Sequence, residues 1–291
     1  MKKLLLVFAH PDDESFTCGG LIPKYVARGW HVELICATKG EKGSRGTYQN
    51  LNADRLGEVR ASELTHAARI LGIGNVHFLG YRDGKLTLQN YGEIEDKLSR
   101  KFLEISPDVI ITFDTTGISN HPDHIKLCNA TTFAFQRYAR EISETRIFVD
   151  KVYQRDPTVK KRHFMSQHMF ALRQQSFADI VDTKEVPKLY YACMPESVAL
   201  YLKKQRVIPS ESFDKAWVGT SDKFITTIID IKRHRLIKEK ALRAHATQQE
   251  DVNRFLRDHS SILMNQEFFI LRMQGTTEVF MGKNDQVSDR L

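Results

Sequence analysis

The first 140 residues alternate between short apolar runs and amphipathic stretches. Strand-like apolar runs occur at residues 4–9, 31–38, 75–80 and 108–113. Helical patterns follow them at about residues 17–29, 54–72, 91–105 and 122–140. Short connections between strands and helices predict a parallel sheet with right-handed crossovers. Because the strand runs are almost continuously apolar, we expect helices to cover both faces of this sheet.

Beyond about residue 140 the pattern is less regular. It contains candidate strands at 177–183 and 224–231, a strong helical pattern at 231–248 and a further predicted helix at 261–273. The fold class is therefore expected to be α/β, a Rossmann-like, mainly parallel sheet with helices on both faces. We expect residues 1–140 to form this core. Residues 141–291 are expected to form a C-terminal α+β extension that packs on the core, completes the substrate pocket and belongs to the same structural unit.

Composition narrows the possible partners. The net charge is +7, but the basic residues are scattered and 36 acidic residues offset them. Neither zinc-finger spacing nor an RNP-type aromatic pattern is present, so we expect no nucleic-acid partner. The four cysteines form no C-x-x-C pair, which disfavours a disulfide framework or an all-thiolate zinc site.

Hydropathy disfavours a membrane protein. No apolar run approaches the roughly 20 residues that a membrane helix needs. The apolar run after Met1, Lys2 and Lys3 is short and ends in a charged turn without a small-residue cleavage site, unlike a signal peptide. We expect a cytoplasmic protein, and a homo-oligomer is possible.

A cluster of charge follows the first predicted strand. The turn reads AHPDDE at residues 9–14, where a dinucleotide-binding fold would carry G-x-G-x-x-G. The one nearby glycine pair is Gly19-Gly20. Acidic side chains at this edge of the sheet would repel a pyrophosphate and attract a cation. The turn therefore disfavours dinucleotide binding.

A second such turn, HPDH at residues 121–124, follows the fourth predicted strand. The carboxyl ends of parallel strands lie at one edge of the sheet, so the two turns are expected to meet. Imidazoles and carboxylates without a thiolate suit a divalent metal of the zinc type, and three protein ligands leave a position open for water. Because adjacent side chains diverge, one of Asp12 and Asp13 can bind metal while the other faces the water. Either turn alone could instead be an acidic helix cap.

Both turns resemble those of the PIG-L/LmbE-type zinc-dependent N-deacetylases. The resemblance extends to TKGEKG (38–43), RASEL (60–64), LGYRDG (79–84) and AHATQ (244–248). It is strongest from residue 3 to about 135 and resumes in the stretch that ends at residue 248. Residues from about 140 to 220 match no motif.

The resemblance implies a role for each matched residue. It implies one zinc ion per chain, held by His10, Asp13 and His124. Asp12 would be the general base, His121 the general acid or oxyanion stabiliser, and Asp123 the residue that orients His121 and keeps its pKa high enough to donate a proton.

The resemblance also implies residues that contact substrate. Arg60 and Asp83 would hold a sugar-like substrate, and His245 and Gln248 would close the site. Some members carry a tyrosine two residues before HPDH that stabilises the oxyanion. Here that position is Ser119, so a tyrosine or arginine from the extension would have to replace it.

The expected function is hydrolysis of the N-acetyl or N-acyl group of an N-acetylglucosamine-type amino-sugar conjugate, a small-molecule substrate. An amidase acting on a related thiol-sugar or antibiotic conjugate is an alternative. A metal-dependent phosphoesterase would need two metals and more carboxylates than these turns supply. A non-catalytic metal- or sugar-binding protein would not need both Asp12 and His121.

Overall fold

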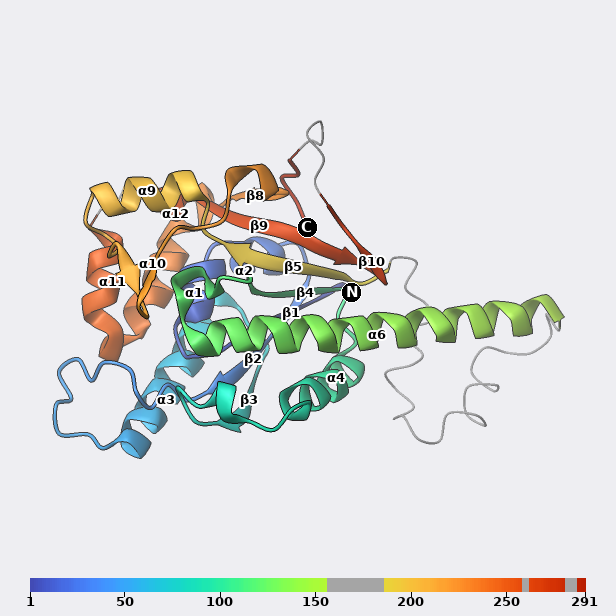
Figure 1. The fold of residues 1–291 in the computed structure, drawn as a ribbon, viewed down its shortest axis with the longest axis horizontal. Helices are drawn as coiled ribbons and strands as arrows, with labels where there is room; N and C mark the ends of the chain where they lie inside the picture. The colour runs from blue at the N-terminus through green and yellow to red at the C-terminus, as the bar shows by residue number, and fades with distance from the viewer. Residues whose placement is uncertain (156–185, 258–261, 281–286) are drawn as a thin grey trace.

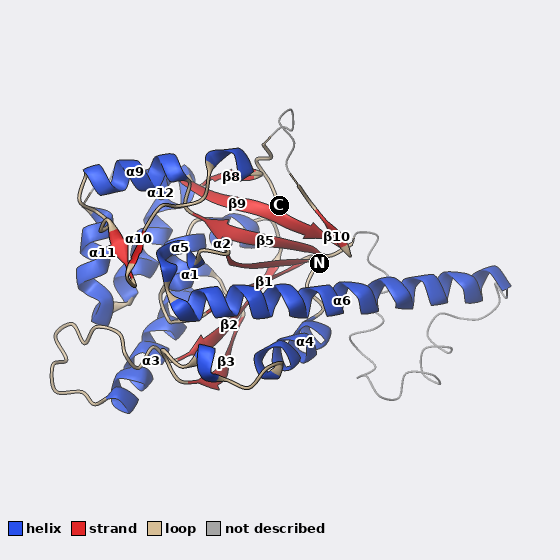
Figure 2. Cartoon of the chain, viewed as in Figure 1, coloured by secondary structure: helices blue, strands red, loops and turns tan. Residues whose placement is uncertain are grey.

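The computed structural model describes residues 1–155, 186–257, 262–280 and 287–291. Within these ranges a mixed sheet of eight strands forms the centre of the molecule (Figures 1 and 2). Five parallel strands lie in the order β3-β2-β1-β4-β5, and β9 continues the sheet antiparallel to β5. The strands are β1 (Lys3–Phe8), β2 (His31–Thr38), β3 (Asn75–Tyr81), β4 (Val109–Phe113), β5 (Lys188–Cys193), β8 (Thr227–Asp230), β9 (Gln266–Gln274) and β10 (Thr277–Glu278).

Helices cover both faces of the sheet, which confirms the predicted fold class. Helix α4 packs against α6, and α10 packs against both α3 and α1 (Figure 1). The core helices are α1 (Asp13–Cys18), α2 (Leu21–Val26), α3 (Ala53–Leu71), α4 (Glu93–Ile105), α5 (Gly117–Asn120) and α6 (Pro122–Arg155). The later helices are α9 (Glu196–Lys204), α10 (Arg235–Ala244), α11 (Gln249–Leu256) and α12 (Ile262–Asn265).

The apolar runs form strands for the expected reason. Residues Leu4 to Phe8 are each at most 1% exposed, because sheet neighbours and helices on both faces cover them. The helix α3 shows the expected end signals. The Asn52 side chain accepts a hydrogen bond from the Arg55 N–H at its start, and Gly72 ends it with a φ of 86°.

Two predicted helices differ in the structure. The stretch 17–29 is broken into α1 and α2 at Gly19-Gly20, where the Glu267 carboxylate accepts hydrogen bonds from the Gly20 and Leu21 N–H groups. The prediction of a helix at 261–273 was wrong beyond residue 265. Residues 266–274 form β9, because pairing with β5 on one side and β8 on the other satisfies their backbone and buries Phe268 and Phe269.

The extension holds the remaining differences. The candidate strand at 177–183 lies outside the described residues. The strand at 224–231 narrows to β8, and the helix at 231–248 narrows to α10 between 3₁₀ turns. The strand β5 was not predicted, although the apolar run after Pro187 carries its signal. The division at residue 140 stays a prediction, while strands from both predicted parts share one sheet.

Candidate functional site

The two charged turns meet at one edge of the sheet. Their strands β1 and β4 are direct neighbours, with Leu4 opposite Val109. Continuing past these strands, the turns bring His10 against His124. The Nδ1 atom of His10 lies 3.0 Å from Nε2 of His124. The meeting predicted from the sequence therefore occurs in the structure.

The carboxylate of Asp13 lies beside both imidazoles. Its Oδ1 is 3.5 Å from His124 Nε2, and its Oδ2 is 3.7 Å from His10 Nδ1. Oδ2 also accepts a hydrogen bond from the His10 backbone N–H, which fixes the carboxylate in this position. All three residues are at most 8% exposed. Two nitrogen atoms and a carboxylate thus share one small buried space.

The other nitrogen of each ring determines what this space can hold. His124 Nδ1 lies 3.1 Å from the Gly117 carbonyl oxygen, so Nδ1 carries the proton and Nε2 presents a lone pair. His10 Nε2 lies 3.1 Å from Asp83 Oδ1 and 3.5 Å from Asp123 Oδ2, which favours a proton there and a lone pair on Nδ1. Two such nitrogen atoms beside a carboxylate are held together by a shared proton or by a metal cation. Metal-binding histidines have this outer arrangement.

The electrostatics of His10 agree with this interpretation. Burial by itself lowers its pKa, but the carboxylates of Asp123, Asp83 and Asp13 raise the pKa to about 10. The surroundings of this ring therefore favour positive charge. Imidazole nitrogen and carboxylate oxygen are ligands that suit zinc, so the residues present fit the metal that the sequence analysis expected. Among the described residues, two groups are close enough to share a metal ion, His10 with His121 and His124, and His10 with Asp83 and Asp123; Asp13 belongs to neither, so its place in the ligand set stays a prediction.

Asp12 has an unusual backbone. Its φ is 118°, a left-handed conformation that is strained for a residue with a side chain. The strain turns the Asp12 side chain away from that of Asp13, as expected for two adjacent acids with different roles. Its Oδ2 atom accepts a hydrogen bond from Arg60 Nη2 at 3.1 Å. Burial raises the pKa of Asp12 to about 7, although Arg60 opposes this shift.

Arg60 reaches the site from the middle of α3. Its guanidinium donates to the carbonyl oxygens of Gly40 and Pro11 at 2.7 and 2.6 Å, in addition to its bond with Asp12. A Cβ atom on Gly40 or Gly43 would lie 2.2 Å from Arg60 Nη1, which explains the glycines of TKGEKG. Arg60 is 3% exposed, so the structure uses it to hold Asp12. Its contact with substrate stays a prediction.

His121 lies between His10 and the extension. Its ring centroid is 4.6 Å from that of His10 and 4.6 Å from that of Phe213. The Asp123 backbone N–H donates to His121 Nδ1, so a neutral His121 carries its proton on Nε2. Burial and the charge of His10 and His124 lower the pKa of His121 to about 3. His121 is thus a neutral hydrogen-bond donor before the reaction begins.

Asp123 is placed differently from the arrangement that the resemblance implies. Its carboxylate accepts hydrogen bonds from the Gly84 and Leu86 N–H groups at 2.6 and 3.1 Å and faces His10 Nε2. The contact with His121 is made by its backbone instead. The Asp123 charge raises the pKa of His121, but this effect is smaller than that of burial. Its catalytic role stays a prediction.

The remaining predicted residues are also buried. Asp83 accepts a hydrogen bond from the Lys42 N–H, and its other oxygen faces His10. His245 is 0% exposed and lies 2.9 Å from Glu14 through its Nε2 atom. Gln248 donates to the Ser44 carbonyl oxygen, which ties the 40–52 loop to the extension. These contacts hold the residues and loops around the site in place. Direct contact with substrate stays a prediction for Asp83 and His245.

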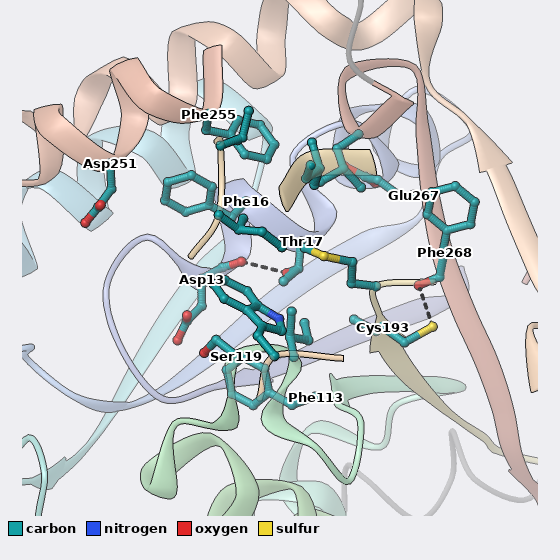
Figure 3. Close-up of a pocket in the computed structure, with 18 of the residues that line it drawn as sticks. Asp13, Phe16, Thr17, Phe113, Ser119, Cys193, Asp251, Phe255, Glu267 and Phe268 are labelled. Carbon is teal, nitrogen blue, oxygen red and sulfur yellow. Dashed lines mark hydrogen bonds between the residues drawn. The ribbon is translucent and has the colours of Figure 1, made fainter. Parts of the chain in front are cut away.

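A cavity of about 350 Å³ opens beside the cluster, with Asp13 and His124 in its wall. Figure 3 shows aromatic side chains around it, with Phe16 and Phe255 on one side, Phe113 and Ser119 on another, and Phe268 beyond. Much of the wall comes from the extension, and its completion of a substrate pocket stays a prediction. Trp217 also lines the cavity, and its buried indole N–H has no hydrogen-bond partner among the described residues.

Sequence analysis missed Trp217 and the hairpin that carries it. The strands β6 (Glu211–Ser212) and β7 (Lys215–Ala216) form this hairpin, and the Asn120 side chain donates to carbonyl oxygens of Ser212, Lys215 and Ala216. Asn120 precedes the HPDH turn, so the hairpin is fastened beside the site. An isolated tryptophan among loop residues carries no signal that would reveal this position.

Fold and site together define an α/β protein with a buried cluster of histidine and aspartate side chains at the carboxyl edge of its parallel strands. Residues 5–135 match the family described as PIG-L, GlcNAc-PI de-N-acetylase. The chain is 31% identical over 266 residues to the 1D-myo-inositol 2-acetamido-2-deoxy-alpha-D-glucopyranoside deacetylase of Saccharomonospora viridis, covering 84% of both chains. The enzyme of the same name from Thermobifida fusca is 30% identical over 269 residues, which cover 85% of this chain and 83% of that one. The chain belongs to the PIG-L family and is an enzyme that acts on an amide bond.

Solved structures confirm the fold. The N,N'-diacetylchitobiose deacetylase of Pyrococcus horikoshii aligns with a TM-score of 0.59 at 19% identity, over 94% of this chain and 84% of that one. The 4-carboxy-2-hydroxymuconate hydratase GalB of Pseudomonas putida aligns with a TM-score of 0.59 at 16% identity, over 96% of this chain and 100% of that one. Because one of these enzymes is a hydratase, the likeness of fold alone does not determine the reaction.

Proposed function

We propose that this enzyme is a zinc-dependent deacetylase that removes the N-acetyl or N-acyl group of an N-acetylglucosamine-type sugar conjugate. The observation that carries the proposal is the approach of His10 Nδ1 and His124 Nε2 to 3.0 Å beside the Asp13 carboxylate. Asp12 next to this centre supplies the base that hydrolysis needs. Relatives about 30% identical over most of the chain are named as deacetylases of an acetamido sugar linked to inositol.

His10, Asp13 and His124 would hold one zinc ion. When bound, zinc lowers the pKa of water toward about 7 and polarises the amide carbonyl. His124 and His10 keep their lone pairs directed at the metal because the Gly117 carbonyl and the Asp83 carboxylate take their other N–H groups. The protein thus fixes the tautomer and orientation of both rings before the metal arrives.

Asp12 takes the proton of the attacking water. Arg60 holds the Asp12 carboxylate at one oxygen, which leaves the other oxygen for water. The left-handed backbone at Asp12 fixes this orientation. General-base catalysis of this kind is worth about 10²–10⁴-fold in rate.

We assign two donors to the oxygen atom that becomes charged when the amide is attacked. His121 presents Nε2–H, because its Nδ1 accepts from the Asp123 N–H. Trp217 supplies the second donor, because its buried indole N–H lacks a partner among the described residues. Ser119, at the position of the family tyrosine, also lines the cavity. Arg254 lines it too, but pairs with Glu250 and Asp251, so Trp217 is the better replacement. The proton that Asp12 takes from water passes to the leaving amine, so Asp12 ends the reaction as a carboxylate and His121 stays neutral throughout.

The alternatives are separated by the number of metals and by the product. A phosphoesterase of the two-metal type needs two adjacent centres, whereas both possible ligand groups in the described ranges share His10. An amidase acting on a thiol-sugar or antibiotic conjugate would use the same residues and differ in substrate only.

No described helix is both long and apolar enough to cross a membrane. We keep a cytoplasmic location as part of the proposal, and leave the oligomeric state to a sedimentation measurement.

The proposal is tested by measuring acetate release from a panel of N-acetylated glucosamine conjugates. We expect release to stop when a chelator removes the metal and to return when zinc is added. A phosphomonoester and a phosphodiester serve as control substrates. Hydrolysis of either ester without acetate release from any sugar would refute the deacetylase assignment.

A further inference from the structure

The cavity beside the predicted metal centre is larger than the acetyl group requires. Its volume is about 350 Å³. An acetyl group extends only one methyl group beyond the scissile carbon, which needs far less space than this cavity offers. For comparison, a water molecule occupies about 30 Å³ in the liquid. Cavities of roughly 300–1,000 Å³ hold ligands of many atoms. The space therefore has room for a longer group attached to the same carbonyl.

The wall of the cavity is mainly apolar. Phe113 and Phe16 contribute from the core, and the extension adds aliphatic and aromatic side chains from the residue after β5, from α9 and the following loop, and from α11, α12 and β9. These extension residues are Met194, Leu202, Val207, Ile208, Phe255, Leu263 and Phe268. Removing an alkyl group from water against such a wall is favourable by about 0.8 kcal/mol per methylene, which corresponds to nearly fourfold in affinity.

The charged groups in the wall are paired with each other. Lys238 Nζ lies 2.8 Å from Glu267 Oε1, and both side chains are at most 2% exposed. Arg254 Nη1 lies 3.4 Å from Asp251 Oδ1 at the other end. These charges are satisfied within the protein, so they do not call for a charged ligand. Away from the metal centre, the rest of the surface left for a ligand is mainly apolar, with Thr17, Ser119 and the Trp217 indole N–H as its polar groups.

The position of the cavity indicates which side of the amide enters it. Asp13 and His124 line it, whereas Asp12, Arg60 and Asp83 do not. The cavity thus reaches the centre from one side, and the polar residues predicted to serve the sugar lie on another. The acyl and amino parts of an amide point in opposite directions from the carbonyl carbon. Sugar hydroxyls need polar partners along their whole length, whereas this wall is mainly apolar, so the acyl part is the one that fits it better.

We propose that this cavity is an acyl-chain pocket and that the enzyme prefers N-acyl sugars with chains longer than acetyl. This inference rests on the proposed function of the same site. It makes the extension the part of the chain that selects the acyl group. The hairpin that carries Trp217 is fastened by Asn120 at the mouth of the pocket.

The test compares kcat/KM of the zinc-loaded enzyme for N-acetyl-, N-butanoyl- and N-octanoylglucosamine. With two more buried methylenes, we expect kcat/KM for the butanoyl sugar to exceed that for the acetyl sugar by about tenfold. Calorimetric titration of the Asp12→Asn enzyme with the same sugars measures affinity without turnover, and we expect the same order. Hydrolysis of the acetyl sugar alone, with no tighter binding of longer chains, would overturn the pocket proposal and leave the deacetylase intact. Tighter binding of longer chains without any hydrolysis would support the pocket and refute the proposed reaction.

Variants that fill the pocket give the second test. Ile208→Trp projects a large side chain from a half-buried position in the wall, and we expect it to lower kcat/KM for the octanoyl sugar at least about tenfold while the acetyl sugar changes within about twofold. Val207→Phe is a second filling variant. Val218→Trp, at an exposed position outside the wall, is the matched control. Equal losses on all three sugars, or a preference for octyl N-acetylglucosaminide over the octanoyl sugar, would contradict the assignment of the acyl chain to this cavity.

Discussion

His10 Nδ1 and His124 Nε2 face each other at 3.0 Å, and each ring directs its other nitrogen toward an oxygen atom. Two residues 114 positions apart thus present lone pairs to one point. The relationship follows from the sheet, because β1 and β4 are parallel neighbours and both turns leave the same edge. It is the geometric basis of the zinc assignment.

Removing one of these imidazoles should release the metal. We expect His124→Ala to weaken zinc binding by more than about 100-fold, since loss of an outer hydrogen-bond partner alone costs about 10–100-fold. Competition with a fluorescent zinc chelator measures the affinity. His66→Ala, at an exposed position on α3, is the control. Unchanged zinc affinity in His124→Ala would remove this residue from the ligand set.

Asp12 is expected to act on rate and not on metal content. Asp12→Asn retains a residue type that tolerates the left-handed backbone at φ 118°, so the loop should keep its shape. We expect kcat to fall by at least about 100-fold, the scale of a general base. Zinc content per chain should stay the same as in the wild type. Near-normal turnover in this variant would show that another group takes the proton.

Arg60 should act through Asp12. Arg60→Lys cannot reach the Gly40 and Pro11 carbonyls and the Asp12 carboxylate together, because an ammonium lacks the planar fork of a guanidinium. We expect kcat to fall about tenfold, with KM and zinc content little changed. Arg69→Lys, on the exposed side of the same helix, should behave as wild type. A rise in KM at constant kcat would instead support the predicted contact of Arg60 with substrate.

Trp217→Phe keeps an aromatic ring in the cavity wall and removes the indole N–H. If this group stabilises the charged oxygen, kcat should fall about tenfold or more, since such donors are worth up to about 10²–10³-fold. Stopped-flow measurement of the chemical step checks it. The other tryptophan provides the control Trp30→Phe, which lies in the core beside Tyr25. An unchanged chemical step would leave His121 as the sole protein donor of the proposal.

A buried ion pair within the extension holds the carboxylate that links it to the first helices. Lys238 on α10 binds Glu267 on β9, and Glu267 accepts the Gly20 and Leu21 N–H groups between α1 and α2. Lys238→Met leaves a buried carboxylate without its cation, which should lower the free energy of unfolding by about 3–5 kcal/mol. Urea denaturation measures the change. Lys240→Met, exposed on the same helix, should change stability by less than about 0.5 kcal/mol. A loss that small in Lys238→Met would show that the pair contributes little to holding the extension.

The sequence was sufficient to predict those parts of the structure in which local pattern and sheet topology agree. The turns that carry His10 and His124 were placed together because the carboxyl ends of parallel strands share an edge. The strand β9 was predicted as a helix, because a short apolar run without clear alternation fits either structure and its pairing with β5 is a long-range contact. The position of Trp217 depends on hydrogen bonds between Asn120 and the hairpin, which no local pattern encodes. The burial of Arg60 and His245 could likewise not be predicted, because it depends on how the surrounding loops fold.

The central claim is that the two imidazoles share one metal ion. Anomalous diffraction at the zinc absorption edge, from crystals grown with zinc, tests it most directly. We predict a single strong peak per chain, within bonding distance of His10 Nδ1, His124 Nε2 and the Asp13 carboxylate. An electron-density map with no peak at this point, or with His10 and His124 turned to ligate separate ions, would contradict it.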